Sequence, residues 1–409
     1  ILEGGATRPA ADVILNNPDY MNEKKIEMRL VVPVLLSFFV MSFVDLVGIG
    51  KDRVAEDLGL SDFILGLIPF AAFIWFFFLS VPVGIMQARV GKKKMLNAGM
   101  IITGIGLFVP LLFYNFITVI AGFALLGIGN TIVQVSANPL LVDVVPGRRA
   151  SSFLSFSQFI KAIGSMLAAP LAALFASMFN DWKILFLVYG IISFLSVLWL
   201  SMVKIEETAS TGNKASMASA FSLLGNSYIL MMVLSIFLVV GIDVGFNYFS
   251  GKFLTTRFGF EEITAQSGRS IYFFGRMLGT FAGALILTKL SSTRGLLYSA
   301  ILSIITIFLI MVIPASKAAA WVLVFLIGLG VANIFPLVFS LTVQKYPERS
   351  NEISGLMMMA ISGGALIPPV MGLVSDSMGV VPGMGVLLLC AAYLLIVSWI
   401  IIRKKIVTI

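Results

Sequence analysis

Four ionisable side chains stand inside long apolar stretches of this sequence. Asp45 lies within the run from Leu30 to Ile49, and Lys161, Asp243 and Arg276 occupy three of the apolar runs that follow. An ionised group at the depth of a bilayer costs about 3 kcal/mol or more unless it faces water or an opposite charge. We therefore expect these residues to face a water-filled passage, where a carboxylate can carry protons and a cation can bind a solute.

Uncharged polar side chains in the same runs can bind the hydroxyl groups of a polar solute, because each hydroxyl both donates and accepts a hydrogen bond. Asn138 and Asn333 have a structural alternative, since an amide near Pro139 or Pro336 can bond a backbone carbonyl that lacks its helical donor. Tyr272 adds an aromatic face. The candidate substrate-binding residues are Asn130, Gln134, Asn138, Gln158, Lys161, Asn247, Tyr272 and Asn333.

Asp45 and Lys161 are the candidates for proton coupling, and several arrangements of the two are open. A permanent ion pair would keep Asp45 ionised and prevent proton coupling. A pair that opens during the cycle would leave Lys161 as the counter-charge that a proton or the substrate replaces, and this is the arrangement we expect. Lys161 could instead bind an acidic solute directly, and Asp45 could be an outer-end residue wetted by water.

Asp243 and Arg276 stand at comparable depths of neighbouring runs, so we expect a possible ion pair between them. Such a pair could be purely structural or could contact the substrate. Other charged residues flank the connections between runs and could form ion pairs that gate one side, although the arginines among them also serve as topology signals. These residues are Asp143, Arg148, Arg149, Glu348 and Arg349.

The composition predicts an all-α membrane protein. Of the 409 residues, 59% are hydrophobic and 12% charged, whereas a soluble domain has about 25% charged residues. Histidine is absent and Cys390 is the one cysteine, so we expect no disulfide within the chain, no Cys/His metal site and no cofactor. The net charge of +8 resides mainly beside the ends of the apolar runs, which argues against nucleic acid. A nucleophile–base set or phosphate loop is also missing, so we expect no enzyme.

The apolar runs are long enough for twelve transmembrane helices. Most Lys and Arg residues fall in connections that a twelve-span topology places on one side, which predicts that both termini are cytoplasmic. The expected spans are 29–50, 61–87, 94–114, 116–144, 151–178, 182–203, 226–250, 263–290, 295–314, 319–345, 352–375 and 382–402.

The expected spans divide into two related halves. A polar segment rich in Ser, Thr, Ala, Gly and Asn separates them and reads as a flexible linker. Gly127–Asn130 in the fourth span is similar to Gly328–Asn333 in the tenth, and Asp45 in the first matches Asp243 in the seventh. The expected domains are residues 1–20 as an added or leader remnant, 21–205 as the N-terminal six-helix bundle, 206–222 as a cytoplasmic linker, and 223–409 as the C-terminal six-helix bundle.

Three segments carry a resemblance to known transporters. Residues 84–93 (GIMQARVGKK) resemble the loop signature of the major facilitator superfamily, with Ala88 in place of its usual aspartate. Residues 134–139 (QVSANP) and 362–376 (SGGALIPPVMGLVSD) are similar to elements of the fucose/galactose/glucose:proton symporter family. In that family an aspartate of the first span handles protons, which Asp45 matches, and Gln158 matches a residue implicated in sugar binding.

The resemblance implies a major facilitator fold and a secondary active transporter that imports a monosaccharide, as a neutral hexose, by proton symport. The implied partners are a sugar, a proton and the lipid bilayer of a bacterial inner membrane, with a monomeric chain. Gln134 stands where the family has an acid and Lys161 where a relative has a neutral amide. A uniporter, a sodium-coupled carrier, an acidic-sugar carrier and a transport-dead sugar receptor or sensor therefore remain alternatives.

Overall fold

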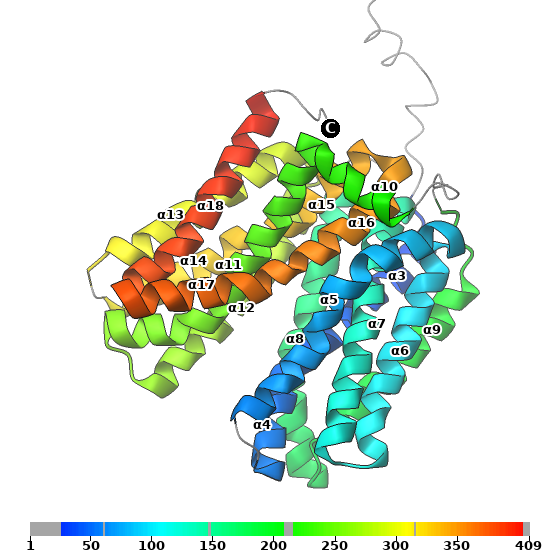
Figure 1. Cartoon of the computed structure of the whole chain (residues 1–409), viewed down its shortest axis with the longest axis horizontal. Helices are drawn as coiled ribbons and strands as arrows, with labels where there is room; N and C mark the ends of the chain where they lie inside the picture. The colour runs from blue at the N-terminus through cyan, green and yellow to red at the C-terminus, as the bar shows by residue number, and fades with distance from the viewer. Residues whose placement is uncertain (1–25, 60–61, 146–148, 208–215, 315, 404–409) are drawn as a thin grey trace, which may run out of the picture.

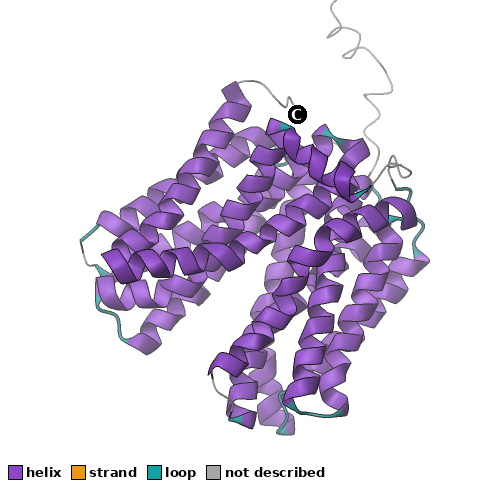
Figure 2. Cartoon of the chain, viewed as in Figure 1, coloured by secondary structure: helices purple, strands orange, loops and turns teal. Residues whose placement is uncertain are grey.

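The computed structural model describes residues 26–59, 62–145, 149–207, 216–314 and 316–403 of the chain. These residues form helices joined by short connections and contain no β-strand (Figure 2). The helices form two groups that meet at one end of the molecule and diverge toward the other (Figure 1). The end that carries α10 (Met217–Ser222) is called the linker end here, and the opposite end the far end. Residues 1–20 lie outside the described part of the chain.

Helices of the N-terminal half follow the expected spans closely, except that the first span is broken into two helices by a 3₁₀ turn, η1. Their bounds are α3 Met28–Met41, η1 Ser42–Asp45, α4 Leu46–Leu58, α5 Asp62–Val90, α6 Lys92–Leu112, α7 Phe116–Val144, α8 Ala150–Phe179 and α9 Ile184–Met202.

The C-terminal half begins beyond α10, and its tenth and eleventh spans are also broken. The bounds are η3 Leu223–Gly225, α11 Ser227–Phe258, α12 Glu262–Ile286, α13 Ser292–Val312, α14 Lys317–Val331, α15 Ile334–Lys345, η4 Pro347–Arg349, α16 Ser350–Met359, η5 Ala360–Ser362, α17 Gly363–Met378 and α18 Val380–Arg403.

Eleven segments within the described residues are long and apolar enough to cross a membrane. The expected span 263–290, which corresponds to α12, is not among them. The helix carries Arg269, Tyr272 and Arg276 at spacings of three and four residues, so they share one helical face. A polar face lowers the mean hydropathy of a helix that has an apolar remainder. The count of twelve spans therefore stays a prediction.

Matching glycines let the helices of both halves pack closely. A Cβ atom on Gly127 of α7 would collide with the Ala72 carbonyl of α5, and one on Gly328 of α14 would collide with the Tyr272 carbonyl of α12. Two residues further on, Gly129 contacts α6 and Gly330 contacts α13. Small residues allow this approach of backbones where lipid offers no hydrophobic drive for packing. The glycine pairs recognised in the sequence thus have the same packing role in the two halves.

Contacts between the halves are made at the linker end. Ser354 of α16 donates a hydrogen bond to the Val135 carbonyl of α7 at 2.6 Å. That carbonyl is available because Pro139, four residues on, has no N–H to donate within the helix. Ser151 of α8 bonds Ser292 at 2.7 Å and Ser340 at 2.8 Å in the other half. Neutral hydroxyl groups therefore contribute directly to this closure.

Candidate functional site

Asp45 lies at the break in the first span, at the end of η1. A 3₁₀ turn inside a helix changes the pattern of backbone hydrogen bonds, and neighbouring side chains complete it. The hydroxyl of Ser42 donates to the Phe39 carbonyl at 2.6 Å, and the amide of Asn130 donates to the Met41 carbonyl at 2.7 Å. Asn130 is completely buried, so in this conformation it supports the break rather than facing a solute.

The Asp45 carboxylate is exposed and accepts a hydrogen bond from the hydroxyl of Ser165 on α8. Ser165 follows Lys161 by one helical turn and also bonds its backbone carbonyl at 3.1 Å. Gln158, Lys161 and Ser165 recur at spacings of three and four residues, so they lie on one face of α8. Ser165 was missed by the sequence reasoning, although its i+4 spacing from Lys161 is the signal that points to it.

Asp243 on α11 is held by two donors from α12. Arg276 forms an ion pair with one carboxylate oxygen, and the Tyr272 hydroxyl donates to the other at 2.7 Å. The Asp243 side chain is 18% exposed and that of Arg276 27%, whereas Tyr272 is completely buried against Phe246 at 5.0 Å between ring centroids. Tyr272 therefore orients Asp243 in this conformation, and its ring is not open to a solute.

The four interior charges interact electrostatically across the boundary between the halves. Lys161 interacts electrostatically with Asp45 of its own half and with Asp243 and Arg276 of the other. Phe159 of α8 contacts Phe281 of α12 with 5.1 Å between ring centroids. Because α8 and α12 run in opposite directions, Lys161 and Arg276 both lie beyond this contact on the side of the far end. The charges thus lie where the bundles begin to diverge.

Three of the candidate amides form a ladder along α7. Gln134 donates to Asn130 at 2.8 Å, and Asn138 donates to the Gln134 backbone carbonyl at 2.8 Å. Gln134 is 6% exposed and Asn138 only 1%. The Asn138 side chain bonds a carbonyl other than the one that Pro139 leaves without a donor, which Ser354 takes. In the present conformation Gln134 and Asn138 therefore bond within α7, and Asn130 also bonds the Met41 carbonyl of α3.

The remaining candidate amides lie apart from the ladder. Asn333, at the break between α14 and α15, donates to the Gly279 carbonyl at 2.7 Å. The side-chain oxygens of Asn247 and Asn333 are buried and lack a hydrogen-bond partner among the described residues. Gln158 is half-buried on the Lys161 face of α8. Gln158 therefore shares a helical face with Lys161, whereas Asn333 bonds α12 three residues beyond Arg276.

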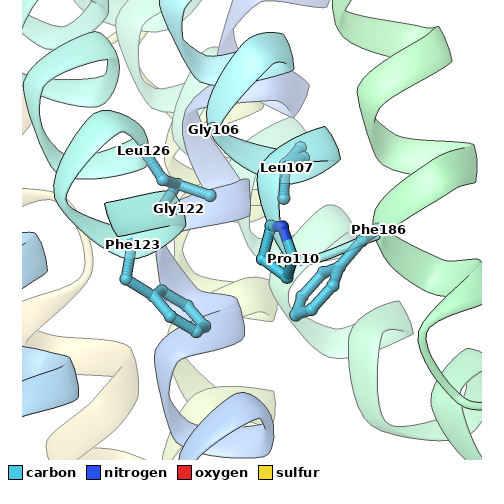
Figure 3. Close-up of a pocket in the computed structure, with 7 residues that line it drawn as sticks. All are labelled: Gly106, Leu107, Pro110, Gly122, Phe123, Leu126 and Phe186. Atoms are coloured by element: carbon cyan, nitrogen blue, oxygen red, sulfur yellow. The ribbon is translucent and has the colours of Figure 1, made fainter. Parts of the chain in front are cut away.

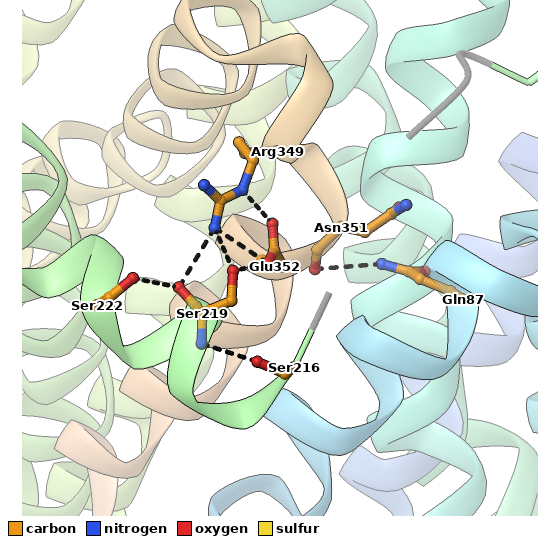
Figure 4. Close-up of polar contacts among 7 residues, drawn as sticks. All are labelled: Gln87, Ser216, Ser219, Ser222, Arg349, Asn351 and Glu352. Carbon is orange, nitrogen blue, oxygen red and sulfur yellow. Dashed lines mark hydrogen bonds and ion pairs between the residues drawn. The ribbon is translucent and has the colours of Figure 1, made fainter. Parts of the chain in front are cut away.

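Charged residues at the linker end organise each half and the linker. Arg349 pairs with Glu352 on α16, and both side chains bond the Ser219 hydroxyl of α10. The side-chain amide of Gln87 on α5 donates to the backbone carbonyl of Asn351 at 3.5 Å (Figure 4). In the N-terminal half, buried Lys92 pairs with Asp143 at 2.6 Å. The Glu207 carboxylate, just before the undescribed part of the linker, accepts from the backbone N–H groups of Lys92 and Lys93 at the start of α6. Arg148, expected to act here, lies outside the described residues.

An apolar pocket opens between α6, α7 and α9 within the N-terminal half (Figure 3). Its lining offers no side-chain hydrogen-bonding group, so it cannot satisfy the hydroxyl groups of a polar solute. None of its lining residues belongs to the charged cluster. It is lined by Gly106, Leu107, Pro110, Gly122, Phe123, Leu126 and Phe186.

Comparisons with known proteins agree with this architecture. The family description Major Facilitator Superfamily matches residues 34–369. The crystal structure of FucP, a transporter of that superfamily in the outward conformation, superposes with a TM-score of 0.80 and 18% identity, covering 90% of this chain and 97% of FucP. The proton:xylose symporter XylE superposes with a TM-score of 0.71 and 14% identity, covering 93% of this chain and 96% of XylE.

Relatives in sequence are named as sugar carriers. A glucose/galactose transporter of Brucella abortus is 27% identical over 348 residues, which are 80% of this chain and 83% of that protein. The L-fucose-proton symporter of Escherichia coli is 22% identical over 368 residues, 79% of this chain and 81% of that protein. These likenesses confirm the fold class and the sugar-transporter resemblance expected from the sequence.

Proposed function

The chain belongs to the Major Facilitator Superfamily, and from that premise we propose that it imports a monosaccharide together with a proton. It is a multi-pass membrane transporter of a family whose relatives here carry glucose, galactose or L-fucose by name. The proposal extends this to a hexose or hexose derivative as cargo, to proton coupling, and to a bacterial inner membrane as the location.

The orientation follows from the charge bias of the connections. Lys and Arg residues are more numerous at the linker end, including Lys92, Lys93, Arg349 and Arg403, and such residues favour the cytoplasmic side. In this orientation the bundles diverge toward the outside (Figure 1). Rocking of one half against the other would then expose the region between them to each side in turn. Both termini would be cytoplasmic.

The position of Asp45 is the observation that supports the proposal most directly. Its carboxylate is exposed at a break deep in the first span, accepts a hydrogen bond from Ser165, and interacts electrostatically with Lys161 between the two halves. A carboxylate that faces water in one conformation and is enclosed in another takes up a proton when its charge becomes costly. Asp45 can therefore bind a proton outside and release it inside, with Lys161 as the counter-charge.

Replacing Asp45 by Asn tests proton coupling, because the amide keeps the shape and cannot bind the proton. In proteoliposomes with an imposed pH gradient, we expect Asp45→Asn to lose uphill accumulation of sugar. Exchange of labelled for unlabelled sugar at equal concentrations should persist, since exchange needs no net proton flux. Asp376→Asn is the matched control, because that exposed side chain pairs with Lys252 at the surface. Full uphill accumulation by Asp45→Asn would refute the role.

A uniporter is the second candidate, because Lys161 interacts electrostatically with Asp45 and could pair with it in another conformation. A cation that never leaves the carboxylate would keep it ionised, and sugar would then flow only down its gradient. The wild-type protein separates the two functions directly: accumulation above the external concentration requires coupling, and equilibration alone indicates uniport. The same measurement with a sodium gradient tests sodium coupling. Binding of sugar without any flux would indicate a receptor.

A further inference from the structure

The fixed charges between the halves cancel. The cluster contains two acids, Asp45 and Asp243, and two bases, Lys161 and Arg276. The neighbouring α7 contributes neutral Gln134 to this region. Further charges lie toward the far end: α4 continues with Lys51, Asp52, Arg53, Glu56 and Asp57, and α12 carries Arg269. Counted by formal charge, with Lys161 and Arg276 protonated, the cluster of four residues is therefore neutral when it is empty and both acids are deprotonated.

Because the empty site is neutral, the charge of the substrate should offset the charge of the ion carried with it. Enclosing an uncompensated charge away from water is costly. If one proton neutralises Asp45 and the substrate is uncharged, the loaded site carries one positive charge with no partner. If the substrate instead brings one negative charge, both the empty and the loaded sites are neutral. A balanced site therefore favours a cargo whose charge opposes that of the proton.

We propose that the substrate is a monosaccharide with one carboxylate, a hexuronate or aldonate, carried with one proton in an electroneutral step. The inference rests on the proposed proton-coupled function and replaces the neutral hexose implied by the resemblance. The proton binds the Asp45 carboxylate from the outside and leaves it on the linker side. The substrate carboxylate takes the place of Asp45 as the counter-charge of Lys161.

The contacts favour Lys161 rather than Arg276 as the partner of the substrate carboxylate. Arg276 is already neutralised by Asp243, whose other oxygen is occupied by Tyr272. No hydrogen bond or ion pair within the described part of the chain reaches the Lys161 ammonium, and Asp45 bonds Ser165 instead. Lys161 therefore has donors to spare, and Gln158 one turn earlier on the same helical face can bond substrate hydroxyls. Exposed Arg269, on the Arg276 face of α12, adds positive charge on the approach.

The wild-type protein in proteoliposomes provides the first test. Glucose, galactose, glucuronate, galacturonate and gluconate are offered with an imposed pH gradient, at membrane potentials clamped by potassium and valinomycin. We expect accumulation of an acidic sugar that depends on the pH gradient and does not change with membrane potential. Accumulation of glucose or galactose with inward current, and none of the acidic sugars, would overturn this inference and leave proton symport standing. Uphill transport of no sugar would overturn proton symport itself.

Substitution of Lys161 provides the second test. Lys161→Gln should raise the concentration of acidic sugar that gives half-maximal transport about tenfold to a hundredfold, because a hydrogen bond to a charged group is lost. Its empty site carries one negative charge, so a proton with a neutral hexose now restores balance, and glucose accumulation should appear. Lys161→Arg keeps the charge and should retain acidic sugar. Lys183→Gln at the far-end surface is the matched control. Unchanged affinity for acidic sugar in Lys161→Gln would refute the assignment.

Discussion

At the scale of single residues, Asp243 is the most constrained charge in the site. One of its oxygens pairs with Arg276 and the other accepts from Tyr272, which itself is fully buried. A carboxylate with both oxygens bonded is fixed in direction, and so is the guanidinium that pairs with it. Tyr272 therefore stabilises the ion pair through its hydrogen bond to Asp243, and this role requires no contact with a solute.

Removing the Tyr272 hydroxyl should destabilise the protein while leaving the ring in place. Tyr272→Phe loses a hydrogen bond to a charged acceptor, which is worth about 1.5–3 kcal/mol, and the packing against Phe246 remains. Thermal unfolding in detergent can be followed with a thiol-reactive dye, since Cys390 is buried until the fold opens. We expect a lower unfolding temperature than for wild type.

Tyr393→Phe is the matched control in the same half. The Tyr393 hydroxyl donates to the neutral backbone carbonyl of Met231 at 3.1 Å, so its loss should cost about 1 kcal/mol. A smaller effect of Tyr272→Phe than of Tyr393→Phe would show that the carboxylate does not depend on the tyrosine.

Sequence reasoning identified the charges of the site but not all of their neighbours. Asp45, Lys161, Asp243 and Arg276 stand out because a charge in an apolar run needs a reason. Ser165 does not stand out, because serines are common in membrane helices and bond their own backbone. The burial of Tyr272 was equally inaccessible, since it depends on how α11 and α12 pack. The roles of all these residues remain predictions.

At the scale of elements, the ranges of the apolar runs predicted most helices within a few residues, but not the breaks inside them. α4 and α11 continue to Leu58 and Phe258, beyond the expected ends at residues 50 and 250. η1, the turn before α15, and η5 interrupt three spans. At the break before α15, Pro336 lacks the N–H that would bond the Ala332 carbonyl four residues earlier. At η1 a tertiary partner completes the backbone bonding, since Asn130 donates to the Met41 carbonyl. Partners distant in sequence cannot be read from a local pattern.

The close packing of α5 against α16 can be tested by adding a single methyl group. A Cβ on Gly355 would lie 2.8 Å from the Ser80 carbonyl oxygen and 3.1 Å from the Val81 Cα. Both are backbone atoms, so the helices must separate, at a cost of about 1–3 kcal/mol. We expect Gly355→Ala to weaken the closure at the linker end and to lower the rate of transport.

A cysteine at position 151 reports this opening, because Ser151 is buried between the halves. In a Cys390→Ser background, Ser151→Cys should react with a small maleimide several-fold faster when Gly355→Ala is present. Gly372→Ala on α17 is the matched control, since nothing lies within 4 Å of the added methyl group. Equal labelling rates in the two alanine variants would show that the Gly355 contact does not hold the linker end closed.

At the scale of the whole molecule, the direction of the carrier depends on two properties that its internal contacts do not fix. One is which end faces the cytoplasm, which the Lys and Arg bias predicts to be the linker end. The other is whether the polar helix α12 crosses the membrane, because the helices after it would otherwise be inverted. An inward carrier of the proposed kind needs both predictions to hold.

Three single cysteines in a Cys390→Ser background measure both properties. Met178 at the far end of α8, Met217 on α10 and Val312 at the far end of α13 are all exposed, by 63%, 45% and 53%. With a membrane-impermeant maleimide, cysteines at 178 and 312 should react in right-side-out vesicles, and the one at 217 only in inverted vesicles. If the cysteine at 178 reacts only in inverted vesicles and the one at 217 reacts in right-side-out vesicles, the proposed orientation of the protein is reversed. If α12 does not cross, α13 runs the other way, and the cysteine at 312 reacts on the same face as 217.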